Sequence, residues 1–519
     1  MCCIPLRVYQ PLLFYDLSLP TITRQANSAV ALPEASLLTL PEKVLQFGTG
    51  VLLRGLPDYL IDKANRQGIF NGRIVVVKST DGGDINAFSR QSGLYTLGIR
   101  GIEDGQQVEE NVVCSAISRV LSAKSQWAEV LEFAKSPELQ LVISNTTEVG
   151  IQLVADDVRQ SPPQSFPGKL LAVLYTRWQT FGGDKTKGLV IVPTELISDN
   201  GSKLECILLE LAHRNELEAE FIDWLETANT CCNSLVDRIV PGRPDAAMQA
   251  ALEAELGYSD DLLTMSEVYR LWAIEGDEKV KAVLSFEQVD KGVVIQPDIN
   301  LFRELKLRLL NGTHTLSCGL AFLSGVDTVR SAMEDEVLSS FITHLMQDDL
   351  RAGIPYPVAE DVSREFGRQV LDRFRNPFIE HRWLGITLNY SAKLQMRTVA
   401  TLACYAERKQ QAPRYAALGF AAYLLFMRAT RQQEHTWYGA LNGAEYPIQD
   451  EKAGYFADLW QRLSPAELVS TVLRNHTLWQ QDLTQLPGFA DQVSADLRQM
   501  LNQGVYATIS SLLNTPVSA

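Results

Sequence analysis

Three polar residues in one short stretch, Lys306, Asn311 and His314, have the side chains needed for proton transfer at a hydroxyl or carbonyl carbon. A lysine that is desolvated gives up its proton readily and acts as a general base. An amide and an imidazole donate hydrogen bonds to the oxyanion that develops. These residue types therefore predict a proton-transfer site that requires no metal.

The spacing of the three residues predicts that they share one side of a helix. At about 100° per residue, Asn311 lies roughly 140° and His314 roughly 80° around the axis from Lys306. Gly312 costs roughly 1 kcal/mol inside a helix, which favours a place where something approaches the backbone. The alternative is a surface helix with Lys306 solvated and the other two side chains satisfied locally.

Length and charge limit the class of protein. A chain of 519 residues is too long for one ordinary core and predicts two to four domains. The formal net charge of -15 argues against nucleic acid or an anionic membrane as a partner. A basic pocket for a small anionic substrate would be a local exception to this charge.

Cysteine and histidine spacing predicts neither disulfides nor a metal site. The eight cysteines contain no C-x-x-C pair, which fits a reducing cytosol. The histidines other than His314 lack metal-ligand spacing, with His381 the least clear of them because it follows an Arg-Asn-Pro segment.

The longest apolar run, residues 415–427, is shorter than the ~18 residues that span a bilayer, and it predicts a buried helix. Residues 1–40 have no signal-peptide pattern and are expected to be an extension outside the core, or the product of a start codon placed too far upstream.

A glycine pattern near the start of the core predicts a nucleotide-binding turn. The apolar segment from Lys43 runs into Gly48-Thr-Gly50, which is followed by a helical pattern, as in a Rossmann unit. Leu53 replaces the third glycine of the G-x-G-x-x-G pattern, so the motif alone is weak. Residues 74–77 and 139–144 read as further buried strands of the same sheet. Lys78 stands where an acidic residue normally holds the ribose, so NADP is not excluded.

Together, these segments resemble the polyol-specific long-chain dehydrogenases, also called the mannitol dehydrogenase family. The catalytic signature of that family is Lys-x4-Asn-x2-His, which Lys306, Asn311 and His314 match. The other matching segments lie in order between residues 43 and 510, at residues 46–50, 53–54, 144–150, 235–239, 310–314, 373–377, 446–450 and 481–488.

The resemblance implies an α/β N-terminal Rossmann-type domain followed by a mainly α-helical C-terminal domain, with nicotinamide and substrate held between them. We place the first domain at residues 41–297 and the helical domain at 298–519, divided at the turn-prone segment 296–300. The apolar spacing after residue 301 is mostly helical and shows few alternations typical of strands.

The resemblance also assigns roles to single residues. Lys306 becomes the base for alcohol oxidation or the acid for ketone reduction, and Asn311 and His314 polarise the reacting oxygen. Asp237 is expected near the substrate, or in a salt bridge with Arg238 or a neighbouring loop; Arg373 and Lys393 are expected to line the substrate pocket. The residues expected to bind the cofactor are Gly48, Thr49, Gly50, Val51, Leu52, Arg54, Lys78 and Thr147.

Two departures from mannitol-type members bear on the substrate. Thr194-Glu195-Leu196 replaces a segment whose asparagine assists the oxyanion, so Asn311 and His314 should carry more of that role. Arg303 occupies a place that is acidic in those members, and a guanidinium there suits a substrate carboxylate, unless it is an exposed residue at the helix entrance.

The resemblance implies hydride transfer between NAD and a keto-sugar acid in hexuronate breakdown in the cytoplasm, and the expected reaction interconverts tagaturonate and altronate. The alternatives are the fructuronate and mannonate pair, a mannitol-type polyol, or a nucleotide-binding sensor that has lost turnover. A small sugar acid is the expected partner, without nucleic acid or membrane.

Overall fold

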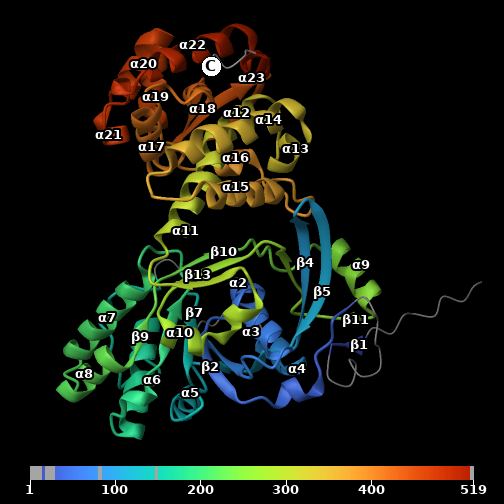
Figure 1. The fold of residues 1–519 in the computed structure, drawn as a ribbon, viewed down its shortest axis with the longest axis vertical. Coiled ribbons are helices and arrows are strands. Elements are labelled where there is room, and N and C mark those ends of the chain that lie inside the picture. The colour runs from blue at the N-terminus through green and yellow to red at the C-terminus, as the bar shows by residue number, and fades with distance from the viewer. Residues whose placement is uncertain (1–14, 18–29, 80–84, 147–149, 515–519) are drawn as a thin grey trace, which may run out of the picture. The chain divides into compact units, whose positions relative to one another are not determined.

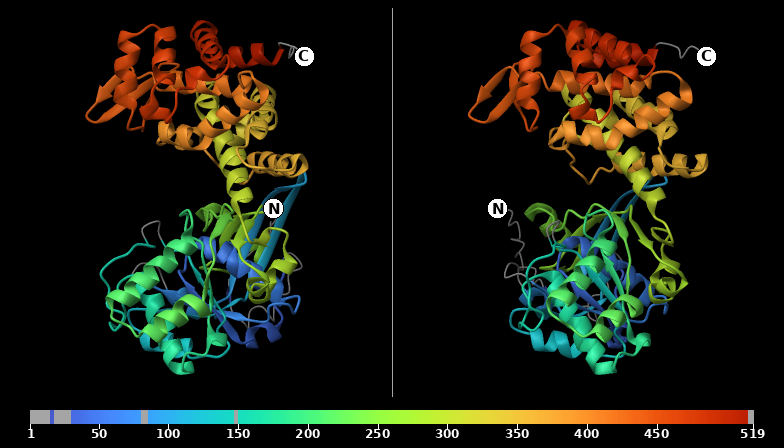
Figure 2. Two further views of the ribbon diagram at one scale, coloured as in Figure 1. Left: turned by 60° about the vertical axis from the view of Figure 1, so that its left-hand side comes forward. Right: turned by 90° about the vertical axis from the view of Figure 1, so that its left-hand side faces the viewer.

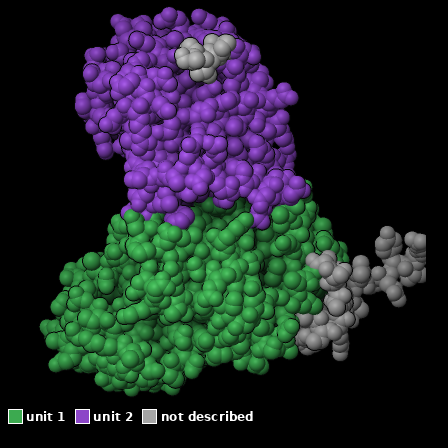
Figure 3. Space-filling view, viewed as in Figure 1, with its two compact units in different colours: residues 1–100, 107–299 green, residues 101–106, 300–519 purple. Residues whose placement is uncertain are grey.

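The computed structural model describes residues 15–17, 30–79, 85–146 and 150–514. The chain forms two compact units, coloured separately in Figure 3. Unit 1 comprises residues 1–100 and 107–299, and unit 2 comprises residues 101–106 and 300–519. The division expected from the sequence lay between residues 297 and 298, whereas here the main division falls between residues 299 and 300.

Unit 1 alternates strands and helices, as Figure 1 shows. Its strands are β1 (Tyr15–Asp16), β2 (Glu42–Phe47), β3 (Arg73–Lys78), β4 (Tyr95–Glu103), β5 (Gln106–Cys114), β6 (Ile117–Ser122), β7 (Leu141–Ser144), β8 (Val190–Pro193), β9 (Thr230–Cys231), β10 (Ser234–Asp237), β11 (Tyr258–Ser259), β12 (Thr264–Glu267), β13 (Leu271–Glu275) and β14 (Val293–Gln296). Its α-helices are α2 (Val51–Gly55), α3 (Pro57–Asn65), α4 (Ile85–Arg90), α5 (Trp127–Ala134), α6 (Phe166–Phe181), α7 (Asn200–Arg214), α8 (Ala219–Ala228), α9 (Ala246–Leu256) and α10 (Glu278–Val283).

The central sheet of unit 1 has six parallel strands in the order β6-β3-β2-β7-β8-β9. Numbered along the chain, this is the 3-2-1-4-5-6 order of a doubly wound dinucleotide-binding sheet. Both faces are covered, because Ile74 and Val76 of β3 enter one core while Val75 and Val77 enter the other. The second of these cores includes residues of α5 to α8, which Figure 2 shows together in green and teal. The strands expected at residues 74–77 and 139–144 are confirmed as β3 and β7.

The described residues among the first forty belong to unit 1 and pack into it. Leu17 and Val30 are buried in a small apolar cluster with Tyr258, and β1 pairs with β11. Arg73 donates to Leu38 O at 2.8 Å, and Arg66 donates to Leu32 O at 2.8 Å. These contacts place the described residues of the segment within the packing of unit 1, whereas the sequence predicted an extension outside the core.

A β-hairpin of unit 1 ends in a turn that belongs to unit 2. The strands β4 and β5 are joined through Asp104 and Gly105, both with positive φ, which is the turn chemistry of a two-residue hairpin. Arg368 contacts Asp104 at 2.6 Å, and Gly105 N donates to Asp372 Oδ2 at 3.2 Å. The tip, residues 101–106, is therefore held by side chains of α15 (Glu360–Phe374).

Unit 2 is largely helical. Its α-helices are α11 (Asn300–Leu305), α12 (Thr313–Leu323), α13 (Val329–Glu334), α14 (Glu336–His344), α15, α16 (Trp383–Ile386), α17 (Tyr390–Lys409), α18 (Arg414–Phe426), α19 (Ala453–Arg462), α20 (Pro465–Leu473), α21 (His476–Trp479), α22 (Phe489–Gln503) and α23 (Val505–Asn514). Two π-helical segments, η4 (Lys306–Gly312) and η5 (Leu345–Leu350), continue α11 and α14.

The core of unit 2 is built around α12 and α18. A Cβ at Gly419 would lie 2.5 Å from Leu316 O, so the glycine allows α18 to approach α12 closely. The apolar run at residues 415–427 is confirmed as a buried helix, with Phe420 and Leu424 fully buried. Buried Asp349 of η5 accepts from Tyr415 N and Ala416 N at the start of α18, which fixes the second π-helical segment against it.

A three-stranded antiparallel sheet interrupts the helices of unit 2, although few strands were expected there. It consists of β15 (Arg431–Gln433), β16 (Thr436–Leu441) and β17 (Ala444–Ile448). Asn442 and Gly443 both have positive φ and join β16 to β17.

In the part of the chain that the structure describes, no helix is both long enough and apolar enough to cross a membrane.

Candidate functional site

The glycine loop of unit 1 lies at the carboxyl ends of β2 and β7, where the strand order reverses. Gly48 has φ +125°, and a Cβ there would lie 2.7 Å from Asn145 O, so only glycine fits. Gly50 is exposed, and a Cβ there would meet nothing within 4 Å. Ligands of such sheets bind at this reversal, where backbone N–H groups face the phosphates. The loop therefore has the shape that a dinucleotide requires.

The helix after the loop is short and broken. It ends at Gly55, and Leu56 leaves the helical region with φ -133° and ψ -80° before Pro57 starts α3. Leu53, at the place of the third glycine, is fully buried. A Cβ at Gly55 would lie 2.8 Å from Val240 Cγ2, so Gly55 provides the close packing expected of that third glycine.

Other residues predicted to bind the cofactor have different surroundings. Thr49, Val51 and Leu52 are half-buried beside Gly50, and Lys78 ends β3 at the same edge of the sheet. Arg54 donates to Leu262 O, and its guanidinium lies 5.6 Å from the centre of the Tyr95 ring. Burial lowers the pKa of Arg54, and these contacts hold its side chain against residues of unit 1. Thr147 lies outside the described residues.

Glu195 organises the loop that follows β7. Its carboxylate accepts from Thr146 N at 2.8 Å, from Thr146 Oγ1 at 3.0 Å and from Ser144 Oγ at 3.1 Å. The sequence showed only that an oxyanion donor is missing from this segment. The structure gives the substituted residue a role in holding the loop beside Gly48.

Asp237 belongs to unit 1, where it ends β10 and is buried. The next residue, Arg238, donates to the backbone carbonyls of Gly55 and Glu267. The guanidinium of Arg238 is thus used to hold backbone segments of unit 1 together.

Lys306 and Asn311 lie on a π-helix, so the α-helical angles expected for them were wrong. The i to i+5 hydrogen bonding of a π-helix places residue i+5 above residue i, as residue i+4 lies in an α-helix. Lys306 and Asn311 are five residues apart and therefore lie closer to one face than the roughly 140° of an α-helix would allow. Single turns of π-helix occur frequently at functional sites.

The burial of this segment differs from the expectation in two respects. Lys306 and Asn311 are half-buried, whereas the lysine was expected to be buried and desolvated. A Cβ at Gly312 would lie 3.5 Å from Leu350 Cδ1, which is an ordinary contact. Close approach of another group therefore does not explain the glycine.

His314 is a buried, neutral imidazole. Its ring stacks on Phe374 with centroids 4.3 Å apart, and the His381 ring lies edge-on at 5.0 Å. Burial lowers the pKa of His314 well below its usual value, and the nearby His381, Arg373 and Arg397 lower it further. Its Nε2 is buried and has no hydrogen-bond partner among the described residues. The site therefore offers an uncharged ring nitrogen to a ligand.

Basic side chains surround this imidazole. Arg373 comes from α15, while Lys393 and Arg397 come from α17. Lys393 Nζ donates to Ile386 O at 3.1 Å, and its pKa is lowered by burial and by Arg397. Arg303, one turn before Lys306, donates to Asn300 Oδ1 at 3.1 Å. Arg373 lies near enough to His314 to lower its pKa, and Lys393 lowers the pKa of the neighbouring His381; that the two residues line a substrate pocket stays a prediction.

Sequence reasoning missed Arg397 and left His381 open. Arg397 follows Lys393 by four residues, and a like-charged pair at that spacing destabilises an isolated helix. That pair was the signal visible in the sequence. Burial lowers the pKa of His381 as well, and Lys393 and Arg373 add to the shift.

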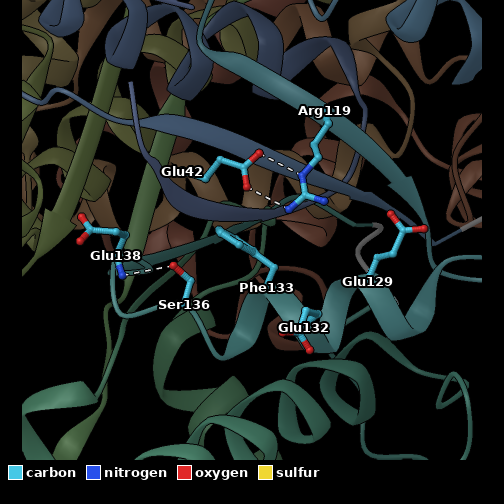
Figure 4. A pocket seen from close by; sticks show the side chains of 7 residues that line it. All are labelled: Glu42, Arg119, Glu129, Glu132, Phe133, Ser136 and Glu138. Atoms are coloured by element: carbon cyan, nitrogen blue, oxygen red, sulfur yellow. Dashed lines mark hydrogen bonds and ion pairs between the residues drawn. The ribbon is translucent and has the colours of Figure 1, made fainter. Parts of the chain in front are cut away.

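Figure 4 shows a pocket on unit 1 whose lining includes the first residue of β2, at the opposite end of that strand from the glycine loop. Glu42, the first residue of β2, and Glu138, which precedes β7, both line it. Glu42 binds Arg119 through two contacts of 2.9 Å. The mainly acidic lining of this pocket is unsuited to the phosphates of a dinucleotide.

The described residues contain no group of three or more His, Cys, Asp or Glu side chains arranged to hold a metal.

Taken together, the sheet order, the glycine loop and the helical second unit define a dehydrogenase of the Rossmann type with an added helical domain. The chain belongs to the mannitol dehydrogenase family: the model of the mannitol dehydrogenase Rossmann domain matches residues 42–288, and that of the mannitol dehydrogenase C-terminal domain matches residues 298–501.

Curated relatives cover almost the whole chain. It is 38% identical to an altronate oxidoreductase of Halalkalibacterium halodurans, over 92% of this chain and 94% of that protein. It is also 38% identical to an altronate oxidoreductase of Bacillus subtilis, over 90% and 94%. A third altronate oxidoreductase, from Yersinia enterocolitica, is 37% identical over 91% and 97%.

Two solved structures share the fold. Mannitol 2-dehydrogenase of Pseudomonas fluorescens, in a ternary complex with NAD and D-mannitol, has a TM-score of 0.67 at 23% identity and covers 96% of this chain and 100% of its own. A substrate-free D-sorbitol dehydrogenase has a TM-score of 0.73 at 20% identity and covers 95% and 100%. These likenesses confirm the two-part α/β and helical architecture predicted from the sequence.

Proposed function

We propose that this chain is an altronate oxidoreductase that uses NAD to interconvert altronate and tagaturonate. The observation that carries this function is the agreement of the curated relatives, which bear that name at 37–38% identity over about nine-tenths of the chain. The residues of the site suit the reaction, because a dehydrogenase acting on a CH-OH group needs a proton acceptor and neutral hydrogen-bond donors.

Unit 1 holds the cofactor in this proposal. The pyrophosphate lies against the open backbone at Gly50 and the turn at Gly48, next to Thr49, Val51 and Leu52. Lys78, at the end of β3, lies beside the ribose. When bound, NAD supplies the hydride acceptor for oxidation of the alcohol. A solved structure of the same fold contains NAD, which supports NAD as the cofactor.

Unit 2 provides the proton chemistry. Lys306 takes the proton from the substrate hydroxyl during oxidation and returns it to the carbonyl oxygen during reduction. Asn311 donates a hydrogen bond to the same oxygen, and His314, which stays neutral, orients it without adding a charge. The proposed substrate contacts are completed by Arg303, Asp237, Arg373 and Lys393.

The experiment that tests this function compares substrates with the purified protein. NADH oxidation at 340 nm is followed with tagaturonate, fructuronate and fructose side by side, in the presence of EDTA, and repeated with NADPH. Turnover confined to tagaturonate and NADH is expected. Preference for fructuronate would reassign the substrate, and inactivity with all three would refute the enzyme assignment.

A further inference from the structure

Arg397 is tied directly to the helix that carries the proposed catalytic residues. Its Nη1 donates to Thr315 Oγ1 at 3.0 Å, and Thr315 Oγ1 in turn donates to Asn311 O at 2.7 Å. Figure 1 shows α12, α15, α16 and α17 together within unit 2. The guanidinium is therefore separated from the backbone of Asn311 by a single side chain.

Two buried polar atoms near this contact have no partner in the described part of the chain. They are Nε of Arg397 and Nε2 of His314. A buried donor without a partner costs about 1–3 kcal/mol, and more when it is charged, so folded proteins seldom leave such groups unsatisfied. Two of them around one bonded network indicate a place where a polar ligand completes the hydrogen bonds.

The charges in this region favour an anion. Lys393 and Arg397 are one turn apart on α17, and the basic groups Arg373, His381 and Arg397 act together on His314. Burial lowers the pKa of Arg397 and of Lys393, so the protein holds these cations at a cost.

Several other arginines of unit 2 are paired with carboxylates. Arg308 binds Glu304 at 2.9 Å, and Arg368 binds Glu365 at 2.7 Å. The formal net charge of -15 makes the concentration of positive charge around His314 an exception in this chain.

We propose that Arg397, with Lys393 beside it, binds the carboxylate of the sugar acid and so selects an acid over an uncharged polyol. This inference rests on the proposed function and adds a residue to its substrate site. The planar guanidinium of Arg397 keeps its Nη1 on Thr315 while its free Nε edge faces a carboxylate oxygen. A neutral polyol would leave the buried charge without a counter-ion.

Steady-state kinetics of matched arginine variants tests the assignment. Arg397→Gln removes the charge, Arg397→Lys keeps it but loses the planar fork, and Arg303→Gln removes the other candidate for the carboxylate. Arg408→Gln is the control, because Arg408 lies on the same helix and donates to the backbone oxygens of Ala352 and Ile354. NADH affinity and the thermal midpoint are measured for each variant.

We expect Arg397→Gln to raise KM for tagaturonate by at least about 10-fold, with a smaller rise for Arg397→Lys and no change for Arg408→Gln. The affinity for NADH should stay within about 2-fold, since Arg397 belongs to the substrate site. Calorimetric titration of altronate into the NADH-bound protein should show the same order of affinities.

An active wild-type protein whose KM is unchanged in Arg397→Gln, or changed only in Arg303→Gln, would overturn the subsite and leave the proposed function standing. A wild-type protein that neither reduces tagaturonate nor binds altronate would overturn both. If Arg397→Gln fails to fold, an unchanged KM in the folded Arg397→Lys variant would count against the proposal.

Discussion

The two glycines of the nucleotide loop should respond to alanine in opposite ways. Gly48→Ala places a side chain at φ +125° and puts its Cβ 2.7 Å from the backbone oxygen of Asn145, which cannot rotate away. Gly50→Ala meets nothing within 4 Å, and Gly50 has φ -63° and ψ 156°, which alanine adopts freely. The first change therefore strains the folded protein, and the second does not.

The size of the difference follows from these contacts. A forced backbone conformation costs about 1–3 kcal/mol, and the clash with a fixed carbonyl adds about 1 kcal/mol or more, so Gly48→Ala should lose roughly 2–4 kcal/mol. At about 2 °C per kcal/mol for a unit of this size, the midpoint of unfolding should fall by roughly 4–8 °C. Gly50→Ala should keep its midpoint but weaken NADH binding by about 10-fold or more, since its Cβ occupies the space the pyrophosphate approaches.

Thermal unfolding followed by tryptophan fluorescence and near-UV circular dichroism measures the first effect, and NADH fluorescence titration measures the second. The wild-type protein and the two variants form a matched set with one methyl group added at positions two residues apart. Equal midpoints for Gly48→Ala and wild type, or an equal loss of midpoint in Gly50→Ala, would refute this account of the loop.

Two further predictions concern the helix that holds the catalytic residues. Lys306→Ala should reduce kcat by about 10²-fold or more with NADH affinity nearly unchanged, because the lysine acts on a proton. The control is Lys409→Ala, at the exposed end of α17. A parallel loss of NADH affinity in Lys306→Ala would contradict the role of Lys306 in proton transfer. His314→Gln should remove a pH dependence of stability. Folding lowers the pKa of His314. Below pH about 6.5 the imidazole is therefore protonated in the unfolded chain but stays neutral in the folded protein. As the pH falls, this group should lower the free energy of unfolding of the wild type by about 1.4 kcal/mol per pH unit. Urea unfolding between pH 5 and 8 measures the difference between the two proteins; identical slopes would show that His314 is not desolvated.

Much of the first unit could be predicted from local patterns. Continuous apolar runs such as Ile74–Val77 mark strands buried on both faces, and Gly48 and Gly50 mark the turn between strand and helix. The third glycine was harder to place, because the helix breaks at Leu56 and Gly55 provides the close packing. No spacing rule for a continuous helix foresees that break.

The candidate site in unit 2 was predicted only in part. The residue types Lys306, Asn311 and His314 were visible, but the π-helical hydrogen bonding depends on packing against neighbouring elements, including η5, and leaves no periodic signal in one turn. Arg397 was missed because its role depends on which face of α17 meets α12, a matter of tertiary packing. The hairpin at Asn442-Gly443 did carry a recognisable sequence signal, which the helical pattern on either side obscured.

The hairpin tip at residues 101–106 has a consequence for how the chain may be divided. The backbone passes from one unit to the other three times, after residues 100, 106 and 299, so a single cut between residues 299 and 300 does not release two complete halves. A fragment starting at residue 300 would lack Asp104 and Gly105 and expose Arg368 and Asp372, which normally hold them. Supplying residues 101–106 as a separate peptide should then restore part of what the fragment lacks. Unit 2 is thus completed by six residues that lie almost two hundred positions before its main segment, which starts at residue 300.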